Sequence, residues 1–554
     1  MRFAVKGLLL MMVCALVLPA AVQVFENGAV NSASYALAPL PNGKIAQGSI
    51  FSIFGSGLAS SARASSFPLP AADGLGGATV TVTPSGGSVT YAILLFTSDG
   101  QINAVMPSAV PVGPATLTVT NGGSSSSIQI QVVKASVGIF TVNQGGTGPA
   151  ALYNYNSASS QPQNAVNQAA HPGQVVILWG TGLGPILPAG FDERNQPQQI
   201  DMKDATGVKV YVGGIAASVQ YAGRSLYAGE DQFNFQVPAD APPGCYVPIY
   251  VVVNGVVSNT ANMAIASGTA LNCTDDFNSA FTSSELANGL RLGSLGLTRV
   301  SFSLLGQLVS TDSASGVFEK FTPAATQAMN GQFGVSVYGA CRVYTYRSGS
   351  STSSATGTPL DAGPQLTLTL PDGSTKTLSQ GTTADGKGSY SIPFDPQNPL
   401  GSPFLDQTGT YKITGPGGAD VGPIITASLP VPTPLLWTNM TDITVVHLSA
   451  DLPITWSGGA PDDAVLIMGM SGLDQNSGAG FICIAKNSDH QFTVPKEVLM
   501  ALPVSADVSG TTSGVLEVGN FPTKNKATIT MPNGLDVLSF VYEFFSAELV
   551  PYQP

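Results

Sequence analysis

The chain has 554 residues, several times the usual length of one domain, so we expect three to five domains, each with its own core. Charged residues make up 10% of the sequence and the formal net charge is −12, with no cluster of Lys and Arg that could follow a phosphate backbone. Composition therefore disfavours nucleic acid as a partner and predicts a surface that is mostly neutral and polar.

The first 22 residues predict a cleavable secretion signal. Two basic residues, Arg2 and Lys6, precede an apolar run over residues 7–18, and small residues follow before Gln23. An uncleaved anchor is the alternative, but this run is shorter than the roughly 20 residues of a spanning helix, and no later segment qualifies. We therefore expect an extracytoplasmic protein, secreted or at the cell surface, with no transmembrane segment after signal removal.

A repeat is visible in the first half of the chain. Residues 48–59, GSIFSIFGSGLA, recur as residues 173–184, GQVVILWGTGLG, and QINAVMP at 101–107 recurs as QFNFQVP at 232–238. Apolar and polar residues alternate within both units, which is typical of half-buried strands in an antiparallel sandwich. The repeat predicts one β-sandwich over residues 28–140, a connecting segment over 141–170 and a second β-sandwich over 171–272.

These motifs carry a resemblance to a known family. VNSASY (30–35), IFGSGLA, GQINAVMP, VGIFT (137–141), LWGTGLG and DQFNFQVP resemble a tandem secreted domain of unknown function found in acidobacterial proteins. Its units are similar to IPT/TIG-type immunoglobulin-like domains. The resemblance covers about residues 28–272 and implies a fold and an export route, but the family offers no catalytic residues to carry over.

Beyond the signal, the chain has four cysteines at positions 245, 273, 341 and 483. An even number in a chain that enters an oxidising compartment predicts disulfides, and the close CxxC spacing of a zinc or redox site is absent from the sequence. Four cysteines allow three pairings. Proximity along the chain favours Cys245 with Cys273, which leaves Cys341 to pair with Cys483.

The second half continues with β-type patterns. The alternating run at 366–370 leads into the Asp372-Gly373 turn, which predicts a hairpin inside a third β domain over residues 273–429, and residues 298–305 predict a further strand. Short helices are expected at 283–290 and 496–502. Three spaced prolines at 430, 432 and 434 indicate a boundary. Residues 430–554 then resemble a C-terminal β-sandwich module that is sometimes attached to the same secreted family.

Residues that could carry catalysis are sparse. His171, His447 and His490 lack metal-ligand spacing, and no GxSxG elbow occurs. Adjacent acids at 192–193, 275–276 and 462–463 lie in turn-like sequence, where solvated or capping roles are common. A calcium site in such turns is an alternative without an EF-hand pattern behind it. We therefore predict no catalytic residue, metal site or cofactor.

Aromatic residues are the best candidates for ligand binding. Exposed rings could stack on sugars, whose C–H faces are apolar, although packing in a core is the common role of large aromatics. The tryptophan at 179 matches Phe54 of the first repeat and is interpreted as a packing residue. The paired Gln and Asn residues at 101, 103, 232 and 234 are expected to satisfy neighbouring backbone groups. The candidates without a repeat counterpart are Tyr153, Tyr155, Tyr344, Tyr346, Trp437 and Trp456.

Taken together, these patterns predict an all-β chain of tandem immunoglobulin-like antiparallel sandwiches followed by further β-sandwich modules. The first hypothesis for its function is a non-enzymatic interaction or scaffold protein whose partner is an extracellular protein or a glycan. A carbohydrate-binding protein that uses exposed aromatics is the alternative. A polysaccharide-active enzyme with acids in the C-terminal half is a further alternative.

Overall fold

The structure is a computed structural model that describes residues 21–67, 69, 73–185, 193–195, 199–274, 289–304, 307–322, 337–347, 357–381, 387–395, 397–398, 401, 403–508, 510–524 and 526–554. Strands dominate this described part, so the predicted all-β class is confirmed. The apolar run of the predicted signal, residues 283–288 of the helix predicted at 283–290 and the acids at 192, 275 and 276 lie outside it, while Leu290 at the end of that predicted helix begins a strand.

The first repeat forms an immunoglobulin-like sandwich of two sheets. Its strand order is that of the immunoglobulin fold, with four main strands in one sheet and a Greek-key crossover into the other, where the short β2 runs parallel to β11. One sheet contains β1 (Gln23–Asn31), β3 (Ile50–Ser56), β9 (Gln101–Val105), β8 (Ile93–Thr97) and β4 (Arg63–Ala64). The other contains β2 (Ile45–Ala46), β11 (Ser124–Val133), β10 (Gly113–Asn121), β6 (Ala78–Pro84), β5 (Gly74–Leu75) and β7 (Thr90–Tyr91).

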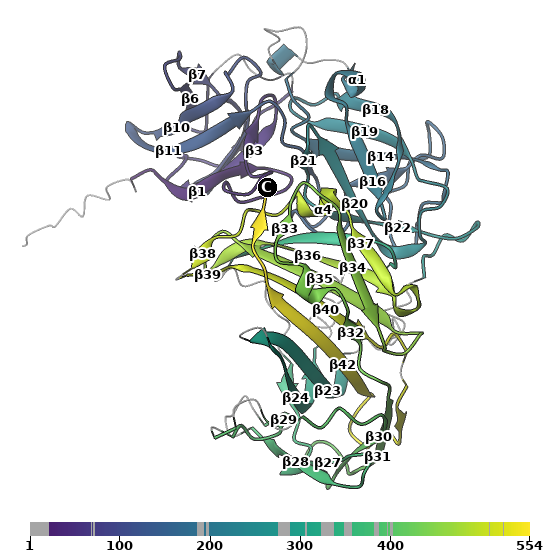
Figure 1. The fold of residues 1–554 in the computed structure, drawn as a ribbon. Helices are drawn as coiled ribbons and strands as arrows, with labels where there is room; N and C mark the ends of the chain where they lie inside the picture. The colour runs from purple at the N-terminus through teal and green to yellow at the C-terminus, as the bar shows by residue number, and fades with distance from the viewer. Residues whose placement is uncertain are drawn as a thin grey trace, which may run out of the picture.

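The second repeat forms a second sandwich of the same order, beside the first (Figure 1). One sheet contains β12 (Gly138–Ile139), β13 (Leu152–Asn154), β14 (Val175–Thr181), β19 (Asp231–Gln236), β18 (Ser218–Arg224) and β15 (Ile200–Asp201). The other contains β17 (Ile215–Ala216), β16 (Lys209–Val212), β20 (Gly244–Val253), β21 (Val256–Val257) and β22 (Ala261–Ile265). Two strands, β12 and β13, bind the same edge of β14, so the predicted connecting segment contributes part of this sheet.

The glycines of the repeat are backbone requirements. Gly57 and Gly182, which the repeat aligns, have φ of 65° and 103°. A Cβ at Gly182 would lie 2.1 Å from the carbonyl oxygen of Ser136. Both glycines therefore end their strands in turns that other residues adopt only with strain.

The second half is organised around one long sheet. In order across the sheet, its strands are β25 (Cys341–Arg347), β36 (Ser477–Lys486), β35 (Ala464–Gly472), β40 (Gly514–Phe521), β42 (Val537–Leu549), β23 (Leu290–Leu304), β24 (Gln307–Phe321), β29 (Ser389–Ser391), β28 (Thr375–Gln380), β27 (Gln365–Thr369), β30 (Gly409–Gly415), β31 (Ile424–Val431) and β41 (Thr528–Ile529), with β26 (Thr358–Pro359) beside β24. The predicted hairpin at 366–373 is β27 and β28, and the predicted strand at 298–305 is the end of β23.

Smaller elements complete this half. They are β32 (Leu436–Trp437), β34 (Leu452–Ser457), β37 (Gln491–Val494), β33 (Val446–His447), β43 (Tyr552–Gln553), β38 (Asp507–Val508) and β39 (Thr511–Thr512). The helices are α1 (Lys203–Thr206), α4 (Lys496–Leu499), η1 (Glu193–Asn195), η3 (Met440–Asp442) and η4 (Asn487–Asp489). The predicted helix at 496–502 is therefore present in shorter form as α4. In the described ranges, no helix has the length and apolar character needed to cross a membrane.

The predicted division at residue 430 does not separate two cores. Strand β42 pairs in parallel with β23, so that Leu292 lies opposite Val537. Phe540 and Phe544 of β42 are buried with Leu295 and Leu366 of the preceding segment. In Figure 1, β42 runs as a yellow strand from the C-terminal module toward the lower body. Strand β42, although it lies near the C-terminus, is therefore needed to complete the core of the range that was predicted as a third domain.

Both predicted disulfides are present. Cys245 is bonded to Cys273 at a sequence separation of 28, and Cys341 is bonded to Cys483 at a separation of 142. The second bond joins directly opposed residues of β25 and β36, so it ties residues on both sides of the predicted boundary. The predicted pairing is therefore confirmed.

Candidate ligand-binding site

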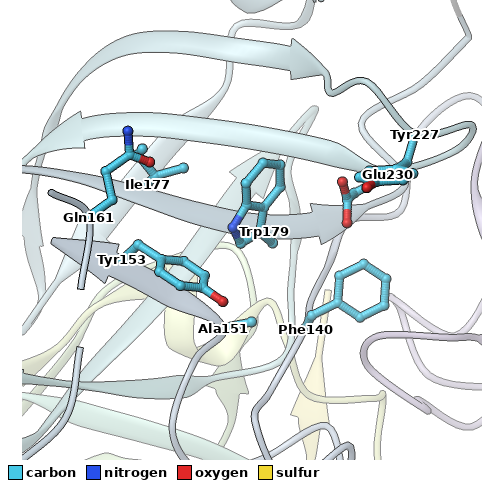
Figure 2. A pocket seen from close by; sticks show the side chains of 8 residues that line it. All are labelled: Phe140, Ala151, Tyr153, Gln161, Ile177, Trp179, Tyr227 and Glu230. Carbon is cyan, nitrogen blue, oxygen red and sulfur yellow. The ribbon is translucent and has the colours of Figure 1, made fainter. Parts of the chain in front are cut away.

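An open depression of about 580 Å³ lies on the outer face of the second sandwich (Figure 2). It is not between the two sheets, whose facing side chains fill the core. Aromatic residues dominate its wall, together with one carboxylate. The lining residues are Phe140, Ala151, Tyr153, Gln161, Ile177, Trp179, Tyr227 and Glu230.

Strand alternation places Trp179 on this outer face. In β14, Val176 and Leu178 point into the core and are fully buried, so the positions between them point outward. Trp179 is half-buried at the end of the strand. Tyr153 of β13 pairs with Ile177, which places both residues on the same face of the sheet.

Phe140 is held at the depression by backbone hydrogen bonds from neighbouring segments. Its N–H donates to the carbonyl oxygen of Trp179 at 3.0 Å, and the N–H of Ala151 donates to the carbonyl oxygen of Phe140 at 2.8 Å. The N–H of Trp179 in turn donates to Ala151 at 3.1 Å. Three stretches of chain that are distant in sequence therefore meet in one fixed arrangement.

The hairpin between β18 and β19 supplies Tyr227 and Glu230. The N–H of Ser225 donates to the carbonyl oxygen of Glu230 at 3.0 Å, and the N–H of Glu230 donates to that of Tyr227 at 3.2 Å. The Ser225 hydroxyl also donates to Oε2 of Glu230 at 2.6 Å. Burial raises the pKa of Glu230 above its ordinary value, an effect that the Ser225 hydrogen bond partly offsets.

A buried ion pair supports the base of this hairpin. Arg224 and Asp231 are fully buried, directly opposed in β18 and β19, and joined by a hydrogen-bonded salt bridge. Arg224 also donates to the carbonyl oxygen of Gly184, and Asp231 accepts the N–H of Leu183 at 2.7 Å. These contacts fix the hairpin to the Gly-rich turn after β14.

The first sandwich contributes to the rim of the depression. The ring of Phe67 meets the ring of Tyr227 edge to face, with centroids 5.4 Å apart. Beneath them, Ala228 packs with Ile93 and Val105 of the first sandwich, and Oγ1 of Thr181 accepts the N–H of Ile50 at 2.8 Å. The depression therefore sits next to a packed contact between the two sandwiches.

The two C-terminal tryptophans are core residues, so the prediction that they form an exposed platform is wrong. Trp437 and Trp456 are each 3% exposed and lie opposite one another in β32 and β34. Their indole N–H groups donate to Oδ1 of Asn439 at 2.9 Å and to the carbonyl oxygen of Asn487 at 3.1 Å. Their rings are therefore enclosed and their polar atoms are satisfied inside the fold.

Tyr344 and Tyr346 are half-buried on β25. They lie opposite Gly480 and Gly478 of β36, and a Cβ at Gly480 would lie 2.7 Å from the Tyr344 ring. The two rings thus rest on the backbone of the neighbouring strand. This packing occupies one face of each ring, and binding by this pair stays a prediction.

Two tyrosines were predicted as a pair in the connecting segment. Tyr153 lines the depression, whereas Tyr155 lies just after β13, is 41% exposed and is not among the lining residues. Trp179 was interpreted as a packing residue, yet it is the central ring of the depression in Figure 2. Phe140, Tyr227 and Glu230 gave no sequence signal because the depression assembles them from separate segments. Strand alternation predicts that Trp179 and Leu178 lie on opposite faces of the sheet, but in this apolar run it does not select which face is the outer one.

The paired polar residues of the repeat lie on the outer faces of their sheets. Nε2 of Gln232 donates to Oδ1 of Asn234 at 2.8 Å, and Nε2 of Gln101 donates to Oδ1 of Asn103 at the same distance. These side chains bond mainly to one another and to nearby side chains, which corrects the prediction that they satisfy backbone groups.

Acids elsewhere serve structural contacts. Asp463 is buried and accepts hydrogen bonds from Asn520, Lys526 and Tyr542 at 2.9, 2.6 and 2.8 Å. Glu193 is 1% exposed and accepts the N–H of Ser108 at 2.9 Å. Over the residues that the structure describes, there is no group of three or more His, Cys, Asp or Glu side chains that could hold a metal ion.

Comparison with known proteins gives no family assignment. A scan against protein-family models finds no match, and neither does a search of curated proteins. Among solved structures, a tetra-tandem repeat from the extending region of a large adhesion protein is 13% identical and covers 90% of this chain and 95% of its own, with a TM-score of 0.13. Immunoglobulin domains 1–4 of Sidekick-1 are 10% identical, covering 96% of this chain and 99% of their own, with a TM-score of 0.11. A structural genomics protein of unknown function from Bacteroides thetaiotaomicron is 11% identical, covering 66% and 73%, with a TM-score of 0.15.

These TM-scores describe poor superposition over the whole chain. The immunoglobulin-like assignment therefore rests on the order of strands within the sheets, with β1, β3, β9 and β8 facing β6, β10 and β11 in the first sandwich and β12, β14, β19 and β18 facing β16, β20 and β22 in the second.

Proposed function

We propose that this chain is an exported, non-enzymatic interaction protein. In this proposal, the packed β domains act as a scaffold, and the aromatic depression on the second sandwich contacts the ligand. The observation that carries the proposal is the position of Trp179, a large half-buried ring whose outer side faces a concave site on the fixed backbone of the sheet. Large exposed rings on a rigid element are typical of recognition surfaces.

The chemistry of the depression favours binding over hydrolysis. Glu230 is the single acid among the described residues that line the depression, whereas most glycoside hydrolases need two carboxylates across the reacting bond. The neighbouring Asp231 points away into the buried pair with Arg224. Among the described acids of the C-terminal half, Asp463 is sequestered by Lys526 and Tyr542. A role for that half in polysaccharide cleavage is the weaker alternative.

Export is supported by independent features. The basic and apolar start of the chain is typical of a secretion signal, and two disulfides are typical of an oxidising compartment. The resemblance of residues 28–272 to the secreted acidobacterial tandem family, with IPT/TIG-type units, agrees with this route.

Two measurements test the proposal. The full chain, produced with its own start in a bacterial host, should be recovered outside the cytoplasm, with a new N-terminus near Gln23. The purified protein should then show no turnover of polysaccharide, ester and peptide substrates. The matched variants are Glu230→Gln and Glu26→Gln, which removes an exposed acid of the first sandwich. Turnover that is lost in the first variant and retained in the second would overturn the proposal.

A further inference from the structure

We infer that the depression binds a neutral glycan, with one pyranose ring stacked on Trp179. This inference rests on the proposed function and names its ligand class. A sugar ring presents an apolar C–H face and a rim of hydroxyl groups, so it needs an aromatic surface with hydrogen-bonding groups at its edge. The depression offers both, and its volume of about 580 Å³ lies within the range of small-ligand sites.

The aromatic surface is formed by rings from different segments. In Figure 2, Trp179 lies at the centre, with Tyr153 on one side and Phe140 below, while Tyr227 and Glu230 form the far end. Such an arrangement can cover one sugar ring on its face and meet a neighbouring ring at its side. Aromatic contact area of this kind is gained at small entropic cost because each ring has two rotatable angles.

Polar atoms at the rim are available to hydroxyl groups. The indole N–H of Trp179 has no hydrogen-bond partner among the described residues, in contrast to those of Trp437 and Trp456. Oε2 of Glu230 accepts the Ser225 hydroxyl, which leaves Oε1 to accept a ligand hydroxyl. Gln161 is exposed at the opposite end, where its amide can reach a second sugar. The carboxylate and the amide therefore lie at opposite ends of the aromatic surface, where each can hydrogen-bond to hydroxyl groups of a different sugar ring.

Charge restricts the glycan to a neutral one. Among the described residues that line the depression, Glu230 is the one charged side chain, and none of these residues is Lys or Arg. The chain as a whole has a formal net charge of −12. Uronic acids, sulfated sugars and phosphorylated sugars would therefore be repelled, because the partly buried carboxylate of Glu230 repels a nearby anion more strongly than a fully solvated one does.

The site is organised before a ligand arrives. The Ser225–Glu230 hairpin is closed by its own backbone bonds, and the Arg224–Asp231 pair anchors it. Phe67 supports Tyr227 from the first sandwich. Binding therefore has a small entropic cost from ordering side chains or loops. A low cost matters for sugars because they bury little apolar surface.

The experiment uses the full mature chain. Binding is screened on an array of neutral and anionic glycans and of extended peptides, and the best ligand is measured by calorimetry. We expect neutral glycans to bind and Trp179→Ala to weaken them by about tenfold or more, which equals about 1.4 kcal/mol. Glu230→Gln should weaken binding less, since an amide still accepts one hydroxyl.

Matched controls separate a lost site from a damaged fold. Phe54→Ala changes the equivalent position of the first sandwich, and Tyr91→Ala removes an aromatic that is 42% exposed on the same sandwich. Both should bind within about twofold of the unchanged protein, a difference of about 0.4 kcal/mol. Trp179→Phe should fold normally and keep part of the affinity.

Several results would overturn the inference: binding to no glycan, binding to peptides alone, a preference for anionic glycans, or full affinity in Trp179→Ala. The proposed function fails on a different result, which is turnover that depends on Glu230. If the protein is exported, shows no turnover and binds no glycan, the proposed function holds and this inference is wrong.

Discussion

The two sandwiches share one strand order, yet their outer faces differ. In the first, Phe54 lies next to the ring of Tyr35, with centroids 6.3 Å apart, and the nearby hollow of about 350 Å³ has a mixed wall in which Ser32 and Asn103 lie beside apolar residues such as Leu95. In the second, Trp179 is larger and lies in a wider depression. The repeat thus preserves the core-facing positions, while the outward positions of the same strands are free to acquire different chemistry.

A second difference lies at the start of β19, the strand that pairs with β14. The second sandwich has Asp231 before its QFN motif and pairs it with Arg224, whereas the first has Gly100 before its QIN motif. Only the second copy therefore needs a buried charge pair at this place. The following predictions change features that distinguish the second sandwich from the first.

The largest expected effect is the loss of the buried pair. Arg224→Met leaves Asp231 as an uncompensated buried carboxylate, so the free energy of unfolding should fall by about 3–5 kcal/mol. Denaturant unfolding measures the change. Arg63→Met, an exposed arginine of the first sandwich, is the control and should change stability by less than about 0.5 kcal/mol. Equal effects of the two changes would contradict the assigned role of the pair.

The next effect concerns the disulfide that only the second sandwich has. Replacement of both Cys245 and Cys273 by Ser should cost about 2–4 kcal/mol, because the bond restricts the unfolded chain. Chemical denaturation with and without a reductant checks this. If the double variant equals the oxidised protein in stability, the bond contributes nothing to the fold.

A smaller effect on stability is expected from the loss of Trp179, for which the core residue Trp456 serves as the reference. Trp179→Ala should cost about 1–2 kcal/mol, since a half-buried ring loses only part of its transfer free energy. Trp456→Ala removes a fully enclosed ring and should cost about 3–5 kcal/mol. Thermal unfolding of the two variants ranks them, and the reverse order would contradict the assignment of Trp179 to the surface.

The smallest effect is a pH dependence from Glu230. Burial raises the pKa of its carboxyl group in the folded state, so the folded protein holds this proton more tightly than the unfolded chain does. Stability from this group should therefore fall as the pH rises from near 4.5 through the raised pKa. The stability difference between the unchanged protein and Glu230→Gln, followed from pH 4 to pH 7, measures it. If the stability difference between the two proteins does not change with pH, the pKa of Glu230 is not raised by burial.

Local patterns predicted much of this fold. Alternating residues and aligned glycines predicted the two sandwiches, and the Asp372-Gly373 turn predicted its hairpin, because these signals involve residues close in sequence. The cysteine pairing followed from number and proximity. By contrast, the parallel pairing of β23 with β42 joins segments that are far apart in the chain, and neither strand has a local feature that selects its partner.

The site was harder to predict for a related reason. The VVILW run of β14 is apolar on both faces, so hydrophobic alternation could not distinguish outward Trp179 from inward Leu178. Trp437 and Trp456 lie in segments without a repeat, which removed the comparison that could have indicated their burial. Tyr227 and Glu230 join the site only through a hairpin geometry that depends on the buried ion pair.

Tryptophan fluorescence offers the most direct test that the outer face of the second sandwich is the ligand surface. The chain has three tryptophans, and two of them, Trp437 and Trp456, are each 3% exposed, so a soluble quencher should act mainly on Trp179. We predict that a saturating neutral saccharide protects this fluorescence from the quencher, and that Trp179→Phe abolishes the protected signal. Quenching that is unchanged by the saccharide, or protection that persists in Trp179→Phe, would contradict the account.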